Sequence, residues 1–296
     1  MAAKILSGRE ISAGVREELK ARVGKLKQRG VTPVLIMVRV GEDPASVSYM
    51  RQKEKTAAEV GVESETVVFP EDTPEATLLA KIDELNRDPA VHGILVQLPL
   101  PRHIDPGKVI EAIDPRKDVD CFHPVNVGKL LLGKPYLLPC TPHGVQQILL
   151  RSGYSPEGKH VVICGRSNIN GKPLFAILIQ KQAGANATVT VCHSRTPDLA
   201  RFTRQADILV VAIGRPRAIT ADMVREGAVV IDVGVNRIPD PSKKSGFRLV
   251  GDTDFEALSE KVEAITPVPG GVGPMTVTML MWNTITACEV QSGVSG

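Results

Sequence analysis

Short runs of consecutive apolar residues are the feature that most constrains the fold of this chain. They lie within residues 34–38, 92–98, 160–164, 207–214 and 227–234. A strand that is apolar on successive residues is usually covered on both faces, as in parallel sheets flanked by helices. Segments with helical periodicity lie between most of these runs, and parallel strands need crossovers of this kind. We therefore expect an α/β protein with parallel sheets.

The first half of the chain alternates such strands with helices. Ser7 and Glu10 form a capping-box pattern, and apolar residues then recur at helical spacing. A second helix is expected after Pro44, a strand near residues 65–69, and a third helix from Pro74. This order predicts a parallel sheet in the first half.

Composition narrows the class of protein. The chain has 296 residues, of which 43% are hydrophobic and 23% charged, and its net charge of +3 gives no reason to expect nucleic acid or membrane binding. Five cysteines without a close pair are expected to be reduced thiols in the cytoplasm. The first residues lack the apolar core of a signal peptide, and no run is long enough to span a bilayer.

Tyr49 and Lys53 are the first candidate site residues. On the expected helix they lie one turn apart on the same face. Tyrosine can stack on a ring and form a hydrogen bond, while a lysine in a poorly hydrated cleft loses proton affinity and becomes a base. The alternative is a solvated basic face that also includes Arg51 and Lys55.

Gln97 and Asp120 are two further candidates. Gln97 follows the apolar run 92–98 at the end of a strand, where ligands of parallel sheets gather, although it could equally cap the edge of the sheet. Asp120 lies in an irregular charged stretch with Asp118. Two carboxylates are too few for a cation site, so no metal is expected. The two carboxylates could equally belong to a solvated loop, and Asp120 would have a binding role only with a ligand that carries adjacent N–H donors.

The second half contains a nucleotide-binding pattern. The strand 160–164 leads into a glycine-bearing turn and then a helix, the arrangement that holds a pyrophosphate. The following strand, 187–191, ends without the carboxylate that binds the ribose of NAD. Arg166, Ser194 and Arg195 offer donors and positive charge there instead, which favours the 2′-phosphate of NADP. Loop arginines in water are the alternative.

Glycine and proline residues give further predictions for the second half of the chain. Gly214 ends one buried strand, where the missing side chain lets a cofactor approach the backbone. Residues 247–252 are expected to form another buried strand. The segment 265–276 is rich in proline and glycine beside apolar residues, which indicates a shaped loop over a ligand rather than a linker. Residues 141–269 are therefore expected to form a doubly wound nucleotide domain.

Several motifs together resemble the family of bifunctional methylenetetrahydrofolate dehydrogenase/methenyltetrahydrofolate cyclohydrolases. They occur in the family's order over nearly the whole chain. The matching segments are Ser48-Tyr49 with Lys53, residues 91–100, 117–120, 139–142, 165–167 and 265–279. The Val-Gln-Leu-Pro run and the proline- and glycine-rich run are specific to the family, whereas the glycine turn is not.

The resemblance implies a role for each candidate residue. Lys53 would be the key cyclohydrolase residue, assisted by Gln97 and Tyr49, and Asp120 would hold the pterin. The folate pocket would be lined by Pro269, Gly270, Gly271 and Val272, and the cofactor would be contacted by Gly165, Arg166, Ser167, Ser194 and Val235.

The resemblance also implies the architecture and the reactions. A folate-binding domain of residues 1–140 and 270–296 would carry an inserted Rossmann-like NADP domain of residues 141–269, with the active site between them. The protein would be a cytoplasmic homodimer that serves one-carbon metabolism and purine biosynthesis. NADP would oxidise 5,10-methylenetetrahydrofolate to the 5,10-methenyl form, which water would convert to 10-formyltetrahydrofolate.

Some positions depart from the family pattern, and other functions remain open. Cys121 stands where the family usually has glycine, and Asn170 and Thr253 stand where valine is common. Cys121 would affect the loop that bears Asp120. The alternatives are a non-catalytic NADP-binding regulator on the same fold and a dehydrogenase without hydrolase activity. The order of the motifs argues strongly against a short-chain dehydrogenase, because there the tyrosine and lysine follow the cofactor turn instead of preceding it.

Overall fold

The chain forms two compact units in the computed structural model, which describes residues 2–243 and 246–294. The six-stranded unit comprises Met1–Ser12 and Thr141–Thr276. The three-stranded unit comprises Ala13–Cys140 and Val277–Gly296. Both are built from parallel strands and helices, as expected.

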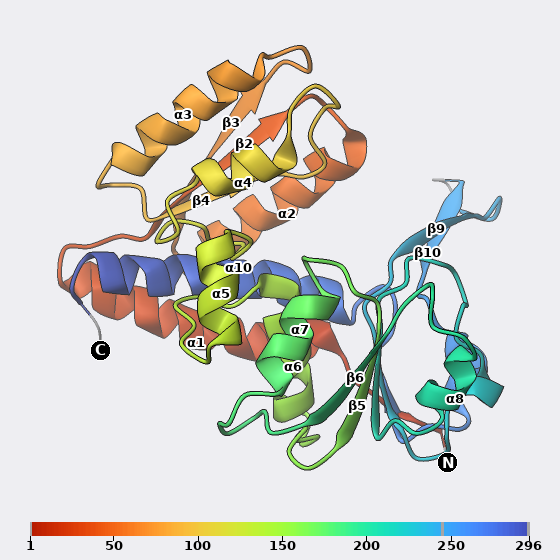
Figure 1. The fold of residues 1–296 in the computed structure, drawn as a ribbon. Coiled ribbons are helices and arrows are strands. Elements are labelled where there is room, and N and C mark those ends of the chain that lie inside the picture. The colour runs from red at the N-terminus through yellow and green to blue at the C-terminus, as the bar shows by residue number, and fades with distance from the viewer. Residues whose placement is uncertain (1, 244–245, 295–296) are drawn as a thin grey trace. The chain divides into compact units, whose positions relative to one another are not determined.

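The three-stranded unit has a parallel sheet with strand order β3-β2-β4. Its elements, with the two helices that it shares with the other unit, are α1 (Gly8–Gln28), β2 (Val34–Val40), α2 (Pro44–Val60), β3 (Glu63–Phe69), α3 (Glu75–Arg87), β4 (Gly93–Val96), α4 (Pro106–Ala112), α5 (Pro124–Leu131) and α10 (Val272–Gln291). Helices α3 and α4 cover one face of this sheet, and α2 covers the other (Figure 1).

Apolar periodicity explains how these layers pack. Leu78 and Ile82 of α3 are fully buried against alternate residues of the strands, including Ile36, Val38 and Ile94. Burying a side chain of this size is worth about 1.5–3 kcal/mol. The start of α2 also follows from the sequence. The side chain of Asp43 accepts a hydrogen bond from the N–H of Ser46 and so caps the first turn of the helix.

The six-stranded unit has strand order β1-β11-β8-β7-β5-β6, and each neighbouring pair is parallel. Its elements are β1 (Lys4–Ile5), α6 (Cys140–Arg151), β5 (His160–Cys164), α7 (Gly171–Leu178), β6 (Thr188–Cys192), α8 (Leu199–Thr203), β7 (Ile208–Val211), η1 (Ala221–Met223), β8 (Val229–Asp232), β9 (Asn236–Pro239), β10 (Phe247–Val250), α9 (Phe255–Ser259) and β11 (Ala264–Ile265). Helices α8 and α9 pack on the same core as β5, β7 and β8.

Three features differ from the sequence-based expectation. Residues 1–12 belong to the six-stranded unit, because β1 pairs with β11. The chain returns to the three-stranded unit at Val277 rather than at residue 270. The strand expected over 247–252 is not part of the large sheet, because β10 pairs antiparallel with β9 in a separate hairpin. Its residues are only partly buried, as suits a two-stranded ribbon.

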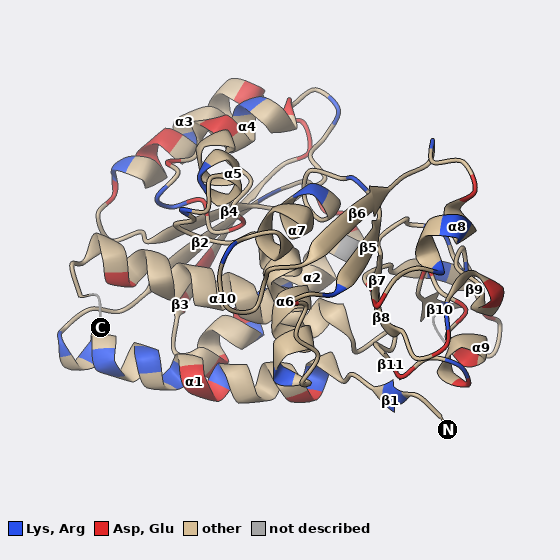
Figure 2. Ribbon diagram, turned by 60° about the horizontal axis from the view of Figure 1, so that its bottom comes forward, with Lys and Arg blue, Asp and Glu red and all other residues tan. Residues whose placement is uncertain are grey.

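Charged residues of both signs are mixed along the surface helices, as on α1 and α3 in Figure 2. On α1, Arg16 pairs with Glu59 and Lys20 pairs with Glu17. Exposed pairs of this kind contribute at most about 1 kcal/mol each. In the part of the chain that the structure describes, no helix combines the length and the apolar composition that a membrane crossing requires.

Candidate active site

A buried lysine is the centre of the site in the three-stranded unit. Lys53 is 5% exposed, and its Nζ donates a hydrogen bond to Oε1 of Gln97 at 2.9 Å. The same Nζ lies 5.0 Å from the centre of the Tyr49 ring. The expected association of these three residues is therefore present, and the alternative of a solvated lysine is wrong.

Local structure explains why these residues meet. Tyr49 and Lys53 are four residues apart on α2, so they share one face of the helix. Gln97 follows β4 directly, and its N–H donates to the carbonyl of Val38 on β2 at 2.8 Å. The start of α2 and the residue after β4 thus both lie beyond the carboxyl ends of adjacent parallel strands, where α/β proteins place their ligands.

Burial changes the proton affinity of two groups here. Loss of hydration lowers the pKa of Lys53, while the negative charge of Asp120 partly raises it again. Burial raises the pKa of Asp120 to about 6, against the lowering effect of the Lys53 charge. A lysine whose pKa is lowered by burial is more often unprotonated near neutral pH and can then accept a proton. The arrangement is therefore suited to general acid–base chemistry.

The loop that bears Asp120 is held by a buried thiol and an amide. Cys121 is fully buried with φ of 61°, in the left-handed region that favours glycine, and its Sγ donates to the carbonyl of Leu137 at 3.2 Å. Nδ2 of Asn283 donates to the carbonyl of Val119 at 2.7 Å. The sequence pointed to Cys121 only as a departure from the family pattern, and nothing in it indicated Asn283.

The six-stranded unit contains a cavity of about 560 Å³ at the carboxyl ends of β5, β6 and β7. It is lined by Cys164, Gly165, Arg166, Ser167, Cys192, His193, Ser194, Thr196, Leu199, Ala212, Ile213, Arg215 and Ala218. The turn after β5 needs its glycine, because a Cβ on Gly165 would lie 2.4 Å from the carbonyl oxygen of Ala212. Glycine backbone, hydroxyls and arginines together suit a phosphorylated dinucleotide.

Comparison with known proteins decides the family. The model of the tetrahydrofolate dehydrogenase/cyclohydrolase catalytic domain matches residues 6–120, and that of the NAD(P)-binding domain of the same family matches residues 139–292. This chain belongs to that family.

Similar proteins match along the full length. The Bifunctional protein FolD of Syntrophus aciditrophicus is 57% identical over 294 residues, which are 99% of this chain and 100% of the relative. A Campylobacter jejuni FolD structure has 46% identity and a TM-score of 0.92, covering 98% of this chain and 99% of that chain. A Trypanosoma brucei FolD structure, complexed with NADP cofactor and inhibitor, has 40% identity and a TM-score of 0.93, covering 100% of both chains.

In this tetrahydrofolate dehydrogenase/cyclohydrolase, some of the expected cofactor residues surround one cavity and others do not. Gly165, Arg166, Ser167 and Ser194 line it. Arg195 and Val235 are exposed and are absent from its lining. Gly214 stands between two lining residues, Ile213 and Arg215, which sequence reasoning missed because no motif marks them.

The expected folate-lining segment belongs to the six-stranded unit. Pro269 is exposed and Gly270 is half-buried, with φ of 107°. Gly271 and Val272 are buried, and Val272 begins α10. A Cβ on Gly8 would lie 1.7 Å from the carbonyl oxygen of Gly271, so the segment packs backbone to backbone on the start of α1. Within residues 2–243 and 246–294, no group of three or more metal-ligating side chains is present.

Proposed function

We propose that this chain oxidises 5,10-methylenetetrahydrofolate with NADP and then hydrolyses the 5,10-methenyl product to 10-formyltetrahydrofolate. The observation that carries the proposal is the buried Lys53 bonded to Gln97 beside Tyr49 and Asp120, in a chain that also has a dinucleotide cavity. Membership of the tetrahydrofolate dehydrogenase/cyclohydrolase family and the names of the bifunctional relatives support the same pair of activities.

The hydride step requires alignment. When bound, NADP supplies the acceptor for the hydride that leaves the methylene bridge. Because the methenyl cation is stabilised by its own nitrogen atoms, no protein acid or base is needed for this step. The protein's part is to hold the two molecules in a reactive geometry and to exclude water. The glycine turn after β5 would position the cofactor, and Asp120 would hold the pterin through its N–H groups.

The hydrolytic step requires a base. Water adds to the methenyl carbon while Nζ of Lys53 takes one of its protons, which leaves a hydroxyl on that carbon. The bond from the carbon to N5 then breaks, the hydroxyl loses its proton as the formyl C=O forms, and N5 gains a proton. A lysine with its ordinary pKa of about 10.4 would be protonated at neutral pH, but burial lowers the pKa of Lys53. Gln97 would orient the amine, and the Tyr49 ring would stack on the pterin. Base assistance of this type contributes roughly a hundred- to ten-thousand-fold in rate.

The preference for NADP is assigned to the arginine and hydroxyl groups of the cavity. Arg166 and Ser194 would hold the 2′-phosphate, with Gly165 and Ser167 near the pyrophosphate. The cofactor would also contact Arg195, Gly214 and Val235, which lie outside the cavity lining. Pro269, Gly270, Gly271 and Val272 would line the folate pocket. The lining of a single cavity by Gly165, Arg166, Ser167 and Ser194 supports the assignment of these four residues to the cofactor.

The protein is further proposed to be a cytoplasmic homodimer that supplies purine biosynthesis. Strand β6 supports dimerisation: it is an edge of the large sheet, it carries no charged residue, and Ile169 and Ile179 are 44% and 38% exposed in the segments around α7. An unprotected edge strand is a template for pairing with another chain. Sedimentation of the purified protein tests this part separately.

The first experiment is a spectrophotometric assay of the purified protein. Reduced cofactor should appear with methylenetetrahydrofolate, faster with NADP than with NAD. In a second cuvette without any cofactor, the absorbance of methenyltetrahydrofolate should decay faster than in buffer. A regulator would show neither activity, and a dehydrogenase without hydrolase activity would show only the first. Either result would overturn the proposal.

A further inference from the structure

Two buried carboxylates lie behind the cofactor cavity in the six-stranded unit. Asp232 is the last residue of β8 and Asp252 follows β10, and their exposed fractions are 2% and 0%. Among the described residues, neither takes part in an ion pair. A buried carboxylate without a cation is costly unless several donors bond to it. The hydrogen-bond donors around these two carboxylates therefore indicate which segments the carboxylates hold in place.

Asp252 bonds to the loop that follows β7. Its Oδ2 accepts the N–H of Ile213 at 2.6 Å and that of Gly214 at 2.8 Å, and its Oδ1 accepts the N–H of Arg215 at 3.0 Å. Oδ1 also accepts Nδ2 of Asn236 at 2.8 Å. One side chain thus fixes three successive residues that are 37 to 39 positions away in the sequence.

These three residues form part of the cavity wall. Ile213 and Arg215 line the cavity, and Gly214 between them has φ of 75°. Successive N–H groups that converge in this way form a nest that binds an anion. Here the protein's own carboxylate occupies the nest, so these three N–H groups are already bonded and are not used for a phosphate. The loop therefore has its shape before the cofactor binds, and it offers the Arg215 side chain to the cavity.

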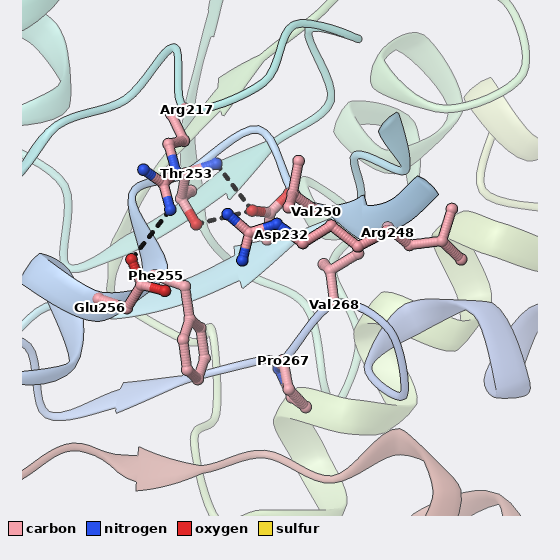
Figure 3. A pocket seen from close by; sticks show the side chains of 11 residues that line it. Arg217, Asp232, Arg248, Val250, Thr253, Phe255, Glu256, Pro267 and Val268 are labelled. Atoms are coloured by element: carbon pink, nitrogen blue, oxygen red, sulfur yellow. Dashed lines mark hydrogen bonds and ion pairs between the residues drawn. The ribbon is translucent and has the colours of Figure 1, made fainter. Parts of the chain in front are cut away.

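Asp232 in turn holds the turn that carries Asp252. Its Oδ1 accepts the N–H of Asp252 at 3.0 Å, and its Oδ2 accepts both the N–H of Thr253 at 2.8 Å and the Thr253 hydroxyl at 2.6 Å. Figure 3 shows the two bonds from Thr253 to Asp232 beside Val250. A Cβ on Gly251 would lie 2.0 Å from Oδ2 of Asp232, so only glycine fits there. The chain of contacts runs from β8 through this turn to the cavity.

We propose that Asp252 is a positioning residue for the cofactor: it shapes residues 213–215 as a wall of the cavity, and Asp232 with the Thr253 hydroxyl holds it in place. Thr253, which replaces the valine common in the family, adds a bond that a valine could not make. The inference rests on the proposed NADP function, and it adds to that function a residue that does not itself touch the cavity.

Two variants test the proposal. Asp252→Asn keeps the size of the side chain but turns an N–H₂ group toward backbone donors. Its Kd for NADP, measured by titration calorimetry, should rise about tenfold or more, because hydrogen bonds to a charged group are among the strongest in a protein. Its KM for NADP should rise with the Kd, while kcat at saturating NADP stays within about twofold. Thr253→Val should raise both constants about two- to fivefold.

The matched control is Thr220→Val, which removes a hydroxyl that bonds to the exposed Asp222 and to neither buried carboxylate. It should leave the Kd for NADP unchanged. Hydrolysis of methenyltetrahydrofolate without cofactor gives an internal reference, because Lys53 and Gln97 lie in the other unit. A general loss of folding would lower this hydrolysis and change the cofactor constants together, whereas a positioning role changes the cofactor constants and leaves this hydrolysis normal.

An unchanged Kd for NADP in Asp252→Asn would overturn the proposal. So would a Thr253→Val variant that binds NADP as Thr220→Val does, and this arm holds even if Asp252→Asn fails to fold. Failure of the proposed function would look different: the unmodified protein would not reduce NADP with methylenetetrahydrofolate. The calorimetric comparison would still report whether Asp252 shapes the cavity.

Discussion

Nζ of Lys53 lies 2.9 Å from Oε1 of Gln97, across 44 residues of sequence. The amide orientation of Gln97 is itself fixed, because its Nε2 donates to the carbonyl of Leu98 at 2.6 Å. An unprotonated lysine has two N–H bonds and one lone pair. When one N–H is held by Gln97, the lone pair has a restricted set of directions, which prepares the amine to take a proton from a water at a defined place.

Lys53→Met should abolish most of the hydrolase activity and leave part of the hydride transfer. Methionine fills a similar volume but cannot accept a proton, so the rate of methenyltetrahydrofolate hydrolysis should fall about a hundredfold or more. The control is Lys55→Met, which removes an exposed lysine from the same helix. Both activities are measured on the same preparations. Near-normal hydrolysis by Lys53→Met would remove Lys53 from the mechanism.

Asp120→Asn should move the pH dependence of hydrolysis to lower pH. The charge of Asp120 raises the pKa of Lys53 against the lowering effect of burial. Without that charge the pKa of Lys53 falls further, and a base acts only when it is unprotonated. The rising limb of kcat against pH, at saturating methenyltetrahydrofolate, should therefore begin earlier. Asp114→Asn, which removes a carboxylate bonded to Arg116, is the control. A shift to higher pH would refute the coupling.

Arg166→Ala should reduce the preference for NADP over NAD, and Arg195→Ala should reduce it less. Arg166 lines the cavity after β5, whereas Arg195 is exposed outside its lining. A charged hydrogen bond to the 2′-phosphate is worth about tenfold in affinity. The ratio of kcat/KM values for the two cofactors measures it in each variant. If the two variants lose preference equally, the assignment of the phosphate to Arg166 is wrong.

Cys121→Val should destabilise the three-stranded unit, while Cys121→Gly should keep the hydrolase activity. Cys121 has φ of 61°, which costs an L-residue about 1–2 kcal/mol, crowds a β-branched side chain further, and carries no steric cost for glycine. The control is Cys288→Val, which adds the same volume at a buried position inside α10. Urea unfolding should give the lower free energy of unfolding for Cys121→Val. Equal values for the two valine variants would contradict a backbone origin.

Elements with a strong local signal were predictable. The apolar runs of β2, β4, β5, β7 and β8 indicated strands covered on both faces, and the structure has them in parallel sheets. The helix start at Asp43 depends only on neighbouring residues. Tyr49 and Lys53 are four residues apart on this helix, so the sequence also predicted that they share one face. The glycine turn after β5 was also predictable, because a strand, a glycine and a helix follow one another directly in the sequence.

Short strands and long-range contacts were not predictable. Strands β1 and β11 have two residues each, too few to show a period, and they exist because a sheet lies beside them. Because β1 pairs with β11, residues 1–12 belong to the six-stranded unit, whereas the sequence-based prediction placed them in the folate-binding domain. The bonds from Asp252 to residues 213–215 likewise depend on how two distant segments meet, and no spacing in the sequence reveals them.

The sequence by itself determined the α/β class, the helix that carries Lys53 and the turn that suits a dinucleotide, because each depends on interactions within one or two turns of the chain. The tertiary structure decided that Lys53 is dehydrated and bonded to Gln97, that Cys121 adopts a glycine-like backbone, and that Arg215 rather than Arg195 lines the cavity. Dehydration and long-range hydrogen bonds are properties of packing, and packing brings together residues that the sequence keeps apart.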